Sequence, residues 1–309
     1  MRIALVTPSG AGTRTGNRHT ALRWAAFLRA AGHRVAVSTA LEGDAELLLA
    51  LHARRSHDSI RRFSQTGRPL VLALTGTDVY RDIRDSTEAR ESLELAHRLI
   101  VLQPKAAEEL PGKHRSKVHV VVQSSATRLR HDPVKKAFRV CVIGHLREEK
   151  DPMRTLAALR HVDLPLEVVH LGAPLDPALG EEAIEGMKSE PRYRWLGSVR
   201  HARALGWLAS SHAMVISSRM EGGANVVCEA LRIGVPVLAS RIPGNVGLLG
   251  KDYGGYFPAG DERALAGSML RAATDATWYR SLKKQIAALR PAVAPRAESA
   301  ALLAAIDFR

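Results

Sequence analysis

The chain has 309 residues, of which 46% are hydrophobic and 5% aromatic, and its 45 Lys and Arg outnumber 31 Asp and Glu to give a net charge of +14. This length suits two domains of about 150 residues, and the apolar fraction excludes a disordered or fibrous chain. No apolar stretch approaches the roughly 18 residues of a membrane-spanning helix, and residues 1–6 run directly into Thr-Pro-Ser-Gly, so we expect neither a membrane span nor a secretory signal. We therefore expect a cytoplasmic protein without stable membrane association.

The positive charge favours anionic partners, but it is spread along the chain, mostly as arginine, and forms neither a dense tail nor a patch interleaved with aromatic residues. A small molecule that bears phosphate fits this pattern better than nucleic acid, and a solvated basic surface is the alternative. Cys141 and Cys228 stand alone in apolar stretches without the spacing of metal ligands, so we expect two buried free thiols and no metal.

The first half of the chain alternates short apolar runs with amphipathic stretches, which is typical of parallel α/β domains. Residues 2–7 form a predicted buried strand, and residues 20–31 form a predicted helix that ends at Gly32. The further predicted strands cover residues 34–39, 45–51, 69–74, 98–102 and 117–123, and the further helices cover residues 88–97 and 105–110.

Residues 126–136 interrupt this pattern with polar and basic residues around a proline, which indicates an interdomain linker. A second alternation then begins. Its predicted strands are residues 138–143, 166–171, 193–196, 213–217 and 236–239, and its predicted helices are residues 152–161, 177–188, 202–209, 225–233, 262–273, 278–289 and 296–306. Parallel sheets bind ligands outside the carboxyl ends of their strands, so functional motifs are expected directly after strands.

A glycine-rich loop follows the first predicted strand and reads Ser-Gly-Ala-Gly-Thr-Arg-Thr-Gly-Asn at residues 9–17. Glycines let the backbone approach an anion, and the following helix N-terminus supplies N–H donors. We expect this loop to bind an anionic acceptor, and a tight turn without a ligand is the alternative. A dinucleotide site is disfavoured, because the glycine spacing differs from the fingerprint and no acidic residue follows the second strand.

A second motif follows the strand at residues 138–143, where Asp151 is a predicted helix N-cap with Pro152 at the first helical position. This would place Arg147 and Lys150 at the mouth of the helix, where they are suited to neutralising a diphosphate. A plain helix start is the alternative.

The third motif is the most informative, because a carboxylate, two glycines and a second carboxylate follow the strand at residues 213–217. Glu221 lies in the loop that follows this strand, and Glu229 lies about one turn inside the next predicted helix. Backbone N–H groups of residues 222–225 suit phosphate or sugar oxygens, and carboxylates accept hydrogen bonds from vicinal hydroxyls. The alternative is that both glutamates only complement the helix dipole.

The second and third motifs together resemble the signature of the retaining GT-B glycosyltransferases of family 4, in which a pair of glutamates with this spacing follows a Gly-Arg-Leu-x-x-x-Lys-Gly element. The resemblance covers nearly the whole chain, because residues 32–35 and 234–237 also look like recurrent turns of that family. It implies an α/β fold of two Rossmann-like domains that face a cleft. Residues 1–130 would be the acceptor domain, with residues 296–309 returning to it as a C-terminal helix, and residues 131–295 would bind the nucleotide sugar.

Carried over to this chain, the resemblance implies that Lys150 contacts the donor diphosphate, that Glu221 contacts sugar hydroxyls and that Glu229 contacts the ribose. Glu221, Lys150 and Arg147 are the expected catalytic residues. His145 stands where the family has arginine, so whether His145 or Arg147 completes the diphosphate clamp stays open. The remaining expected donor-binding residues are Gly144, Gly222, Gly223, Ala224 and Asn225.

A narrower resemblance is to the selenosugar synthases of bacterial selenoneine biosynthesis. It is carried by the Thr-Gly-Asn-Arg run at residues 15–18, by Leu-Thr-Gly-Thr-Asp-Val-Tyr at residues 74–80, and by residues 143–152 and 218–225. It implies transfer of a sugar from a UDP-sugar, UDP-N-acetylglucosamine or UDP-glucose, to selenophosphate. A carbon–selenium bond forms, and UDP and then phosphate are released to give a 1-selenosugar.

Selenium in selenophosphate is already anionic, so this reaction calls for a cationic acceptor pocket rather than a strong general base. No metal-binding DxD motif stands in the usual place, and we expect neither a metal nor another cofactor. The expected acceptor-binding residues are Gly12, Thr13, Arg14, Asn17, Arg18, His19, Thr77 and Asp78. For Asp78, stabilisation of a turn is an equal alternative.

Two other functions stay open, a family 4 glycosyltransferase that acts on a hydroxyl of a lipid or glycan and, less favoured, a dinucleotide-binding oxidoreductase. The sequence leaves undecided the identity of the sugar, the anomeric outcome, whether phosphate loss is catalysed, and the oligomeric state.

Overall fold

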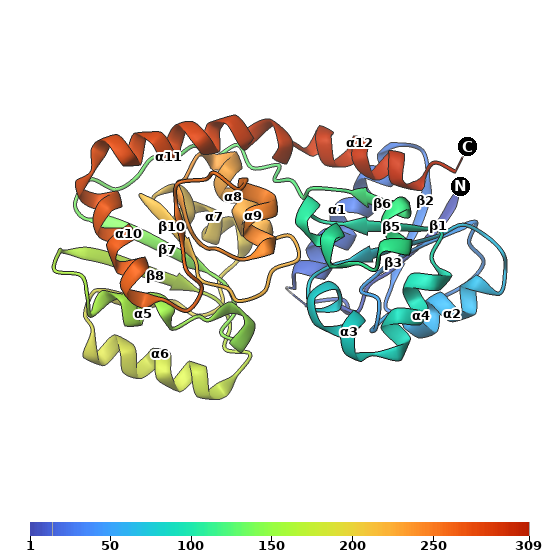
Figure 1. The fold of residues 1–309 in the computed structure, drawn as a ribbon, viewed down its shortest axis with the longest axis horizontal. Coiled ribbons are helices and arrows are strands. Elements are labelled where there is room, and N and C mark those ends of the chain that lie inside the picture. Colours follow the sequence, from blue (N-terminus) through green and yellow to red (C-terminus); the bar gives the residue numbers. More distant parts are fainter. Residues whose placement is uncertain (14, 309) are drawn as a thin grey trace. The chain divides into compact units, whose positions relative to one another are not determined.

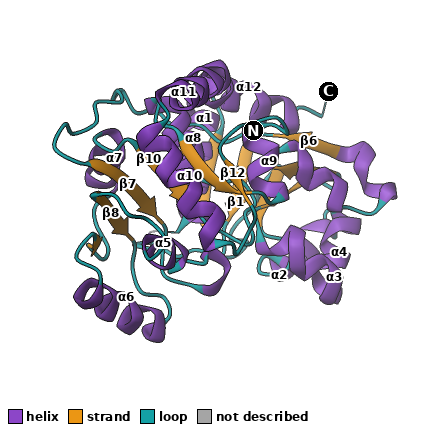
Figure 2. Ribbon diagram, turned by 60° about the vertical axis from the view of Figure 1, so that its left-hand side comes forward, coloured by secondary structure: helices purple, strands orange, loops and turns teal. Residues whose placement is uncertain are grey.

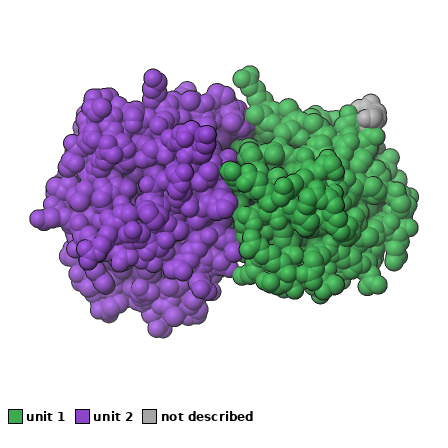
Figure 3. Space-filling view, in the orientation of Figure 1, with its two compact units in different colours: residues 1–123, 295–309 green, residues 124–294 purple. Residues whose placement is uncertain are grey.

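The computed structural model of the protein describes residues 1–13 and 15–308 (Figure 1). The chain divides into two compact units (Figure 3): unit 1 contains residues 1–123 and 295–309, and unit 2 contains residues 124–294. The segment that the sequence identified as a linker has no helix or strand, and it is hydrogen-bonded to unit 2. The His131 N–H donates to Ile233 O over 3.2 Å, and the Asp132 N–H donates to Ala209 O over 2.9 Å.

Unit 1 is built on one parallel sheet with the strand order β2-β1-β3-β4-β5-β6. Helices lie on both faces of this sheet (Figures 1 and 2). The strands are β1 (Arg2–Val6), β2 (Arg34–Ser38), β3 (Leu47–Leu51), β4 (Leu70–Leu74), β5 (Arg98–Val101) and β6 (Val118–Val120), and the helices are α1 (Gly16–Ala30), α2 (His57–Ser64), α3 (Ile83–Asp85), α4 (Thr87–Leu95) and α12 (Pro295–Ile306).

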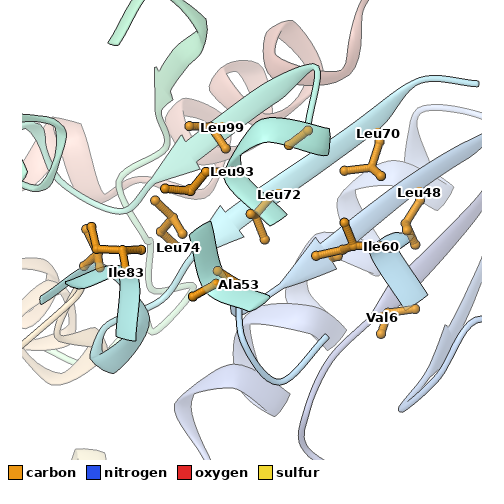
Figure 4. Packing of buried hydrophobic residues seen from close by; sticks show 14 of the residues in the cluster. Val6, Leu48, Ala53, Ile60, Leu70, Leu72, Leu74, Ile83, Leu93 and Leu99 are labelled. Atoms are coloured by element: carbon orange, nitrogen blue, oxygen red, sulfur yellow. The ribbon is translucent and has the colours of Figure 1, made fainter. Parts of the chain in front are cut away.

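The core of unit 1 follows from the two central strands, β3 and β4, which are apolar and buried at every position. Successive side chains of a strand point to opposite faces, so each strand supplies both sides of the sheet. Leu48, Leu70 and Leu72 meet Ile60 of α2 and Leu93 of α4 on one face (Figure 4). The alternating residues of the same strands pack on the other face against Trp24, Ala25 and Leu28 of α1 and Leu302 of α12.

Unit 2 repeats this architecture with a second parallel sheet in the order β12-β11-β10-β7-β8-β9. Its strands are β7 (Phe138–Ile143), β8 (Leu166–Leu171), β9 (Tyr193–Trp195), β10 (Ala213–Ile216), β11 (Val237–Ser240) and β12 (Tyr256–Phe257). Its helices are α5 (Arg154–Leu159), α6 (Pro177–Ser189), α7 (His201–Ala209), α8 (Asn225–Ile233), α9 (Pro243–Leu249), α10 (Glu262–Thr274) and α11 (Ala276–Leu289).

Each sheet has one point at which the direction of winding reverses. In unit 1 the strand β1 lies between β2 and β3, and in unit 2 the strand β7 lies between β8 and β10. Loops that leave such neighbouring strands diverge to opposite faces of the sheet and leave a crevice between their carboxyl ends. In unit 2 this crevice lies between the two loops that carry the second and third sequence motifs.

The predicted α/β class and most elements are confirmed, whereas several boundaries are wrong. Helix α1 begins at Gly16 rather than residue 20, because Thr15 caps it by accepting the Arg18 N–H over 3.3 Å. Asp151 is not an N-cap: its backbone is left-handed, with φ 44°, and α5 begins at Arg154. Helices α2, α3 and α9 and strand β12 were not predicted, and β6 is shorter than expected. Within the described residues, no helix is long and apolar enough to cross a membrane.

The C-terminal helix α12 returns to unit 1, as the sequence resemblance implied, and a buried carboxylate holds it there. The Glu298 side chain has no exposed surface. It accepts hydrogen bonds from Arg23 Nε over 2.8 Å, from Arg23 Nη2 over 3.0 Å and from Trp24 Nε1 over 2.7 Å. The paired, planar geometry of the guanidinium and the indole N–H together compensate the cost of burying the charge.

Replacing Glu298 with alanine should lower the free energy of unfolding by about 3–5 kcal/mol, because it leaves a largely buried guanidinium and an indole N–H without their acceptor. Urea unfolding followed by circular dichroism measures this change. The matched control is Glu185→Ala, which removes an exposed carboxylate that pairs with Lys188 on the surface of α6 and should cost less than about 1 kcal/mol. Equal effects of the two substitutions would contradict the role of Glu298.

Candidate functional site

The second and third motifs meet at the crevice of unit 2 through an ion pair between Lys150 and Glu221. The Lys150 Nζ lies 2.5 Å from Glu221 Oε1, and the two side chains are 21% and 7% exposed. The loops that carry them are also joined through their backbones, since the Arg219 N–H donates to Glu149 O over 2.9 Å. Ser217 Oγ donates to Asp151 O over 2.8 Å. A cation and an anion are therefore fixed together where the two strands end.

Several contacts hold Glu221 in place beyond the ion pair. Ser218 Oγ donates to Glu221 Oε1 over 2.5 Å. The backbone of the same loop is anchored by Ser240 Oγ, which donates to Ser218 O over 2.6 Å. The first turn of α9 packs directly behind the loop: a Cβ at Gly244 would lie 2.1 Å from Glu221 O. Glu221 thus occupies a rigid position that only a glycine at residue 244 permits.

The residues after Glu221 present a row of N–H donors. Gly222, Gly223 and Ala224 are buried and lead into α8, whose first backbone bonds run from Val227 and Cys228 to Ala224 O. In the described part of the chain, no hydrogen bond is made by the backbone N–H groups of residues 222–224. Buried N–H groups seek an acceptor, and the start of a helix adds a partial positive charge. This arrangement suits phosphate or sugar oxygens.

Glu229 lies inside α8 and its carboxylate faces α7. Its side chain is 14% exposed, and Oε1 lies 2.7 Å from Nε2 of His201, whose side chain is 53% exposed. His201 was not among the residues expected from the sequence. An exposed histidine with no apolar periodicity around it gives no signal, so only the folded arrangement reveals it as the partner of Glu229.

Gly144 and His145 are held by the neighbouring strand β8. The Gly144 N–H donates to Leu171 O over 2.9 Å, and His170 Nε2 lies 3.3 Å from Gly144 O. His145 Nδ1 accepts the Ala173 N–H over 3.0 Å. Burial lowers the pKa of His170 to about 4, so its ring is neutral at pH 7 and its single N–H can serve the carbonyl. Backbone bonds therefore fix the direction of the His145 ring.

Arg147 differs from His145, because one N–H donor of its guanidinium makes no hydrogen bond to the described residues. Its Nε is buried without a hydrogen-bond partner, and it lies 4.0 Å from Glu149 Oε2. The side chain is 42% exposed. A buried N–H without an acceptor is costly, whereas His145 already has an assigned backbone partner. Arg147 is thus the side chain of the two with unused donor capacity.

In unit 1, the glycine-rich loop forms a turn closed by Thr13, whose Oγ1 donates to Gly10 O over 2.9 Å. Gly12 has φ 85°, a left-handed conformation that favours glycine. Helix α1 begins at Gly16, so its first turn contains Asn17, Arg18 and His19. This turn contains no acidic residue. The expected acceptor residue Arg14 lies outside the described residues. The loop follows β1, at the point where the winding of this sheet reverses.

Thr77 and Asp78 follow β4 and open a single π-helical turn at Asp78–Asp82. Asp78 is fully buried, and its carboxylate accepts N–H groups from Thr75 over 2.9 Å, Gly76 over 2.7 Å and Ala53 over 3.1 Å. Of the two roles that the sequence left open, these contacts favour stabilisation of the turn. Thr77 Oγ1, in contrast, lies 3.1 Å from Nε2 of His52.

His52 is the residue of unit 1 that sequence reasoning missed most clearly. It follows β3 beside the glycine-rich loop, is 3% exposed, and has φ 76°, an uncommon conformation for a residue other than glycine. Its Nδ1 accepts the Arg55 N–H over 3.3 Å, so in the neutral ring Nε2 carries the proton. Burial is the main cause that lowers its pKa. A histidine directly after an apolar strand was the available signal.

Comparison with known proteins agrees with this geometry. Residues 137–275 match the protein family described as glycosyl transferases group 1. Glycosyltransferase 1 domain-containing protein 1 of Xenopus tropicalis is 27% identical over 270 residues, which cover 76% of this chain and 77% of that protein.

The fold resembles that of Anabaena HepE, solved in complex with UDP-glucose, with a TM-score of 0.79 and 15% identity over 98% of each chain. It also resembles that of sucrose-phosphate synthase from Thermosynechococcus elongatus, with a TM-score of 0.78 and 16% identity over 97% of this chain and 96% of that one. The predicted GT-B fold is confirmed, and with the family match these findings support a glycosyltransferase.

Gly244→Ala should disturb the site, because the added Cβ meets the Glu221 backbone, which must shift to accommodate it. We expect a loss of about 1–3 kcal/mol in the free energy of unfolding, typical of overpacking, together with weakened binding of UDP measured by calorimetry. The control is Gly206→Ala on α7, where nothing lies within 4 Å of the new Cβ. A Gly244→Ala variant that matches this control in both measurements would contradict the close packing behind Glu221.

Proposed function

We propose that the protein is a glycosyltransferase that moves a sugar from a UDP-sugar to selenophosphate, forming a 1-selenosugar and releasing UDP and phosphate. The main support for a nucleotide-sugar donor is the Lys150–Glu221 pair. It lies beside the backbone N–H groups of residues 222–224, which make no hydrogen bond to the described residues, at the start of α8. These groups offer a cation for a diphosphate, amides for its oxygens and a carboxylate for sugar hydroxyls. The complexes of Anabaena HepE with UDP and UDP-glucose support a UDP-sugar as the donor.

In the proposed donor complex, Lys150 exchanges Glu221 for the diphosphate. The released Glu221 carboxylate then accepts hydrogen bonds from the sugar, while Glu229 accepts them from the ribose hydroxyls in place of His201. Arg147, with its unused Nε, supplies the second cation. Preorganised donors that face the departing diphosphate stabilise the charge that develops as the glycosidic bond breaks.

The acceptor half of the proposal rests on unit 1. The first turn of α1 carries Arg18 and His19 and no acidic residue, and its start supplies further partial positive charge. These features suit an acceptor that carries more than one negative charge, such as selenophosphate. His52 and Thr77, at the ends of adjacent strands β3 and β4, are the neutral polar groups of the proposed acceptor site.

The proposed chemistry balances without an oxidant or a reductant. The selenium lone pair of selenophosphate attacks the anomeric carbon, and the bond between that carbon and the diphosphate oxygen breaks with its electrons going to UDP. Water then attacks phosphorus, the phosphorus–selenium bond breaks with its electrons going to selenium, and phosphate leaves. Because selenium is anionic before the reaction, no side chain has to remove a proton from it.

Substitution of Glu229 should affect UDP binding, whereas substitution of Glu221 should affect turnover. Glu229→Ala should weaken UDP binding by about tenfold or more, since it removes charge-assisted hydrogen bonds to the ribose. Glu221→Ala should keep most of the UDP affinity and lower kcat by about 10²-fold or more. Calorimetry with UDP and steady-state kinetics measure both effects, with Glu185→Ala as the control. Unchanged binding and turnover in both variants would refute the donor site.

The acceptor is tested by incubating the protein with UDP-N-acetylglucosamine or UDP-glucose, with and without selenophosphate. We expect UDP release only when selenophosphate is present and a selenium-bearing sugar in the mass spectrum. Arg18→Gln should raise KM for selenophosphate by about tenfold and leave UDP affinity unchanged, because it removes one charged contact. UDP release with a hydroxyl acceptor and none with selenophosphate would reject the selenium chemistry and retain the glycosyltransferase.

A further inference from the structure

Three arginines gather in unit 2 away from the motifs of the donor site. Arg232 lies in the last turn of α8, and Arg290 opens the turn at Arg290–Val293 that follows α11. This turn and α11 both contact α8, and α11 crosses the top of Figure 1. Arg130 immediately precedes His131, whose N–H donates to Ile233 O, directly beside Arg232. The three come from segments that are far apart in the sequence and adjacent in unit 2.

Within residues 1–13 and 15–308, no group of the protein accepts a hydrogen bond from the buried Nε donors of Arg232 and Arg290. Among the described residues, no ion pair joins any of the three arginines to a carboxylate. Buried guanidinium N–H groups that lack an acceptor are costly, and native structures rarely keep them without a ligand or water.

The positive charges of Arg130 and Arg232 lie near Arg290. Burial and then the nearby charges of Arg130 and Arg232 lower the pKa of Arg290. Lys283 is a further positive charge near His131, whose pKa is lowered first by burial and then by this lysine. Asp132 is the acidic neighbour of the same histidine. A cation in the last turn of a helix complements the helix dipole, which explains Arg232 alone and not the gathering of three.

We infer that Arg130, Arg232 and Arg290 form a second anion site in unit 2, which binds a phosphate group. Planar guanidinium forks match the oxygens of phosphate, and the two buried Nε donors would gain the acceptors that they lack. The site lies at the C-terminal end of α8, whereas the proposed donor site lies at the start of that helix. The phosphate group is either inorganic phosphate or the headgroup of an anionic lipid, and exposed Leu129 beside Arg130 is compatible with the second source.

The test uses equilibrium dialysis of the full chain with radiolabelled inorganic phosphate in the presence of saturating UDP, which blocks the proposed donor site. The variants are Arg232→Gln and Arg290→Gln, and the control is Arg263→Gln, an exposed arginine of α10. We expect wild type and control to bind phosphate, and each cluster variant to bind it at least about tenfold more weakly, as the loss of a charge-assisted hydrogen bond predicts. Unchanged UDP affinity shows that the variants keep the fold of unit 2.

A second arm identifies the source of the phosphate group by sedimentation with vesicles of phosphatidylglycerol or of phosphatidylcholine. Binding to phosphatidylglycerol vesicles that disappears in the Arg232→Gln and Arg290→Gln variants supports the site and assigns it to a lipid headgroup. Phosphate binding without vesicle binding supports the site and assigns it to free phosphate. The inference is overturned if wild type binds neither ligand, or if the cluster variants bind as strongly as Arg263→Gln.

Discussion

The ion pair between Lys150 and Glu221 is the constraint on which the candidate site depends. Both side chains are largely removed from water, so each charge needs the other, and an isolated buried charge at either position would be strongly unfavourable. The pair keeps a cation and a carboxylate ready at the carboxyl ends of β7 and β10. In the proposed donor complex, a diphosphate replaces Glu221 beside Lys150, and this replacement frees the carboxylate for a sugar. Under this proposal, donor binding itself prepares the carboxylate for the reaction.

The topology of the sheets decides which residues can take part. In each unit, two loops leave neighbouring strands at the point where the winding reverses, and the glycine-rich loop and the second and third motifs lie on such loops. In unit 2 they are the loops after β7 and β10. In unit 1 they are the loops after β1 and β3, which carry the glycine-rich turn and His52. Glycines at residues 172 and 244 then permit contacts that a Cβ would block, against Gly144 O and Glu221 O.

The sequence predicted the strands well because buried parallel strands are continuous apolar runs, such as the Leu-Leu-Leu-Ala-Leu of β3. It singled out the two loops that meet at the crevice of unit 2, because their residue types and spacing are unusual. It failed where long-range contacts decide the outcome. Asp151 resembles an N-cap locally, yet its backbone is left-handed and its carbonyl oxygen accepts a hydrogen bond from Ser217 Oγ of the neighbouring loop. His201 carries no local signal, whereas His52 had one, its place directly after the apolar strand β3, which was not recognised.

A crystal structure of the protein with UDP bound tests the central claim most directly. The donor proposal predicts that Lys150 Nζ leaves Glu221 and lies about 2.8 Å from a phosphate oxygen. It also predicts that amides of residues 222–224 face the diphosphate and that Glu229 contacts the ribose in place of His201. UDP bound elsewhere, with the Lys150–Glu221 and His201–Glu229 pairs both intact, would contradict it.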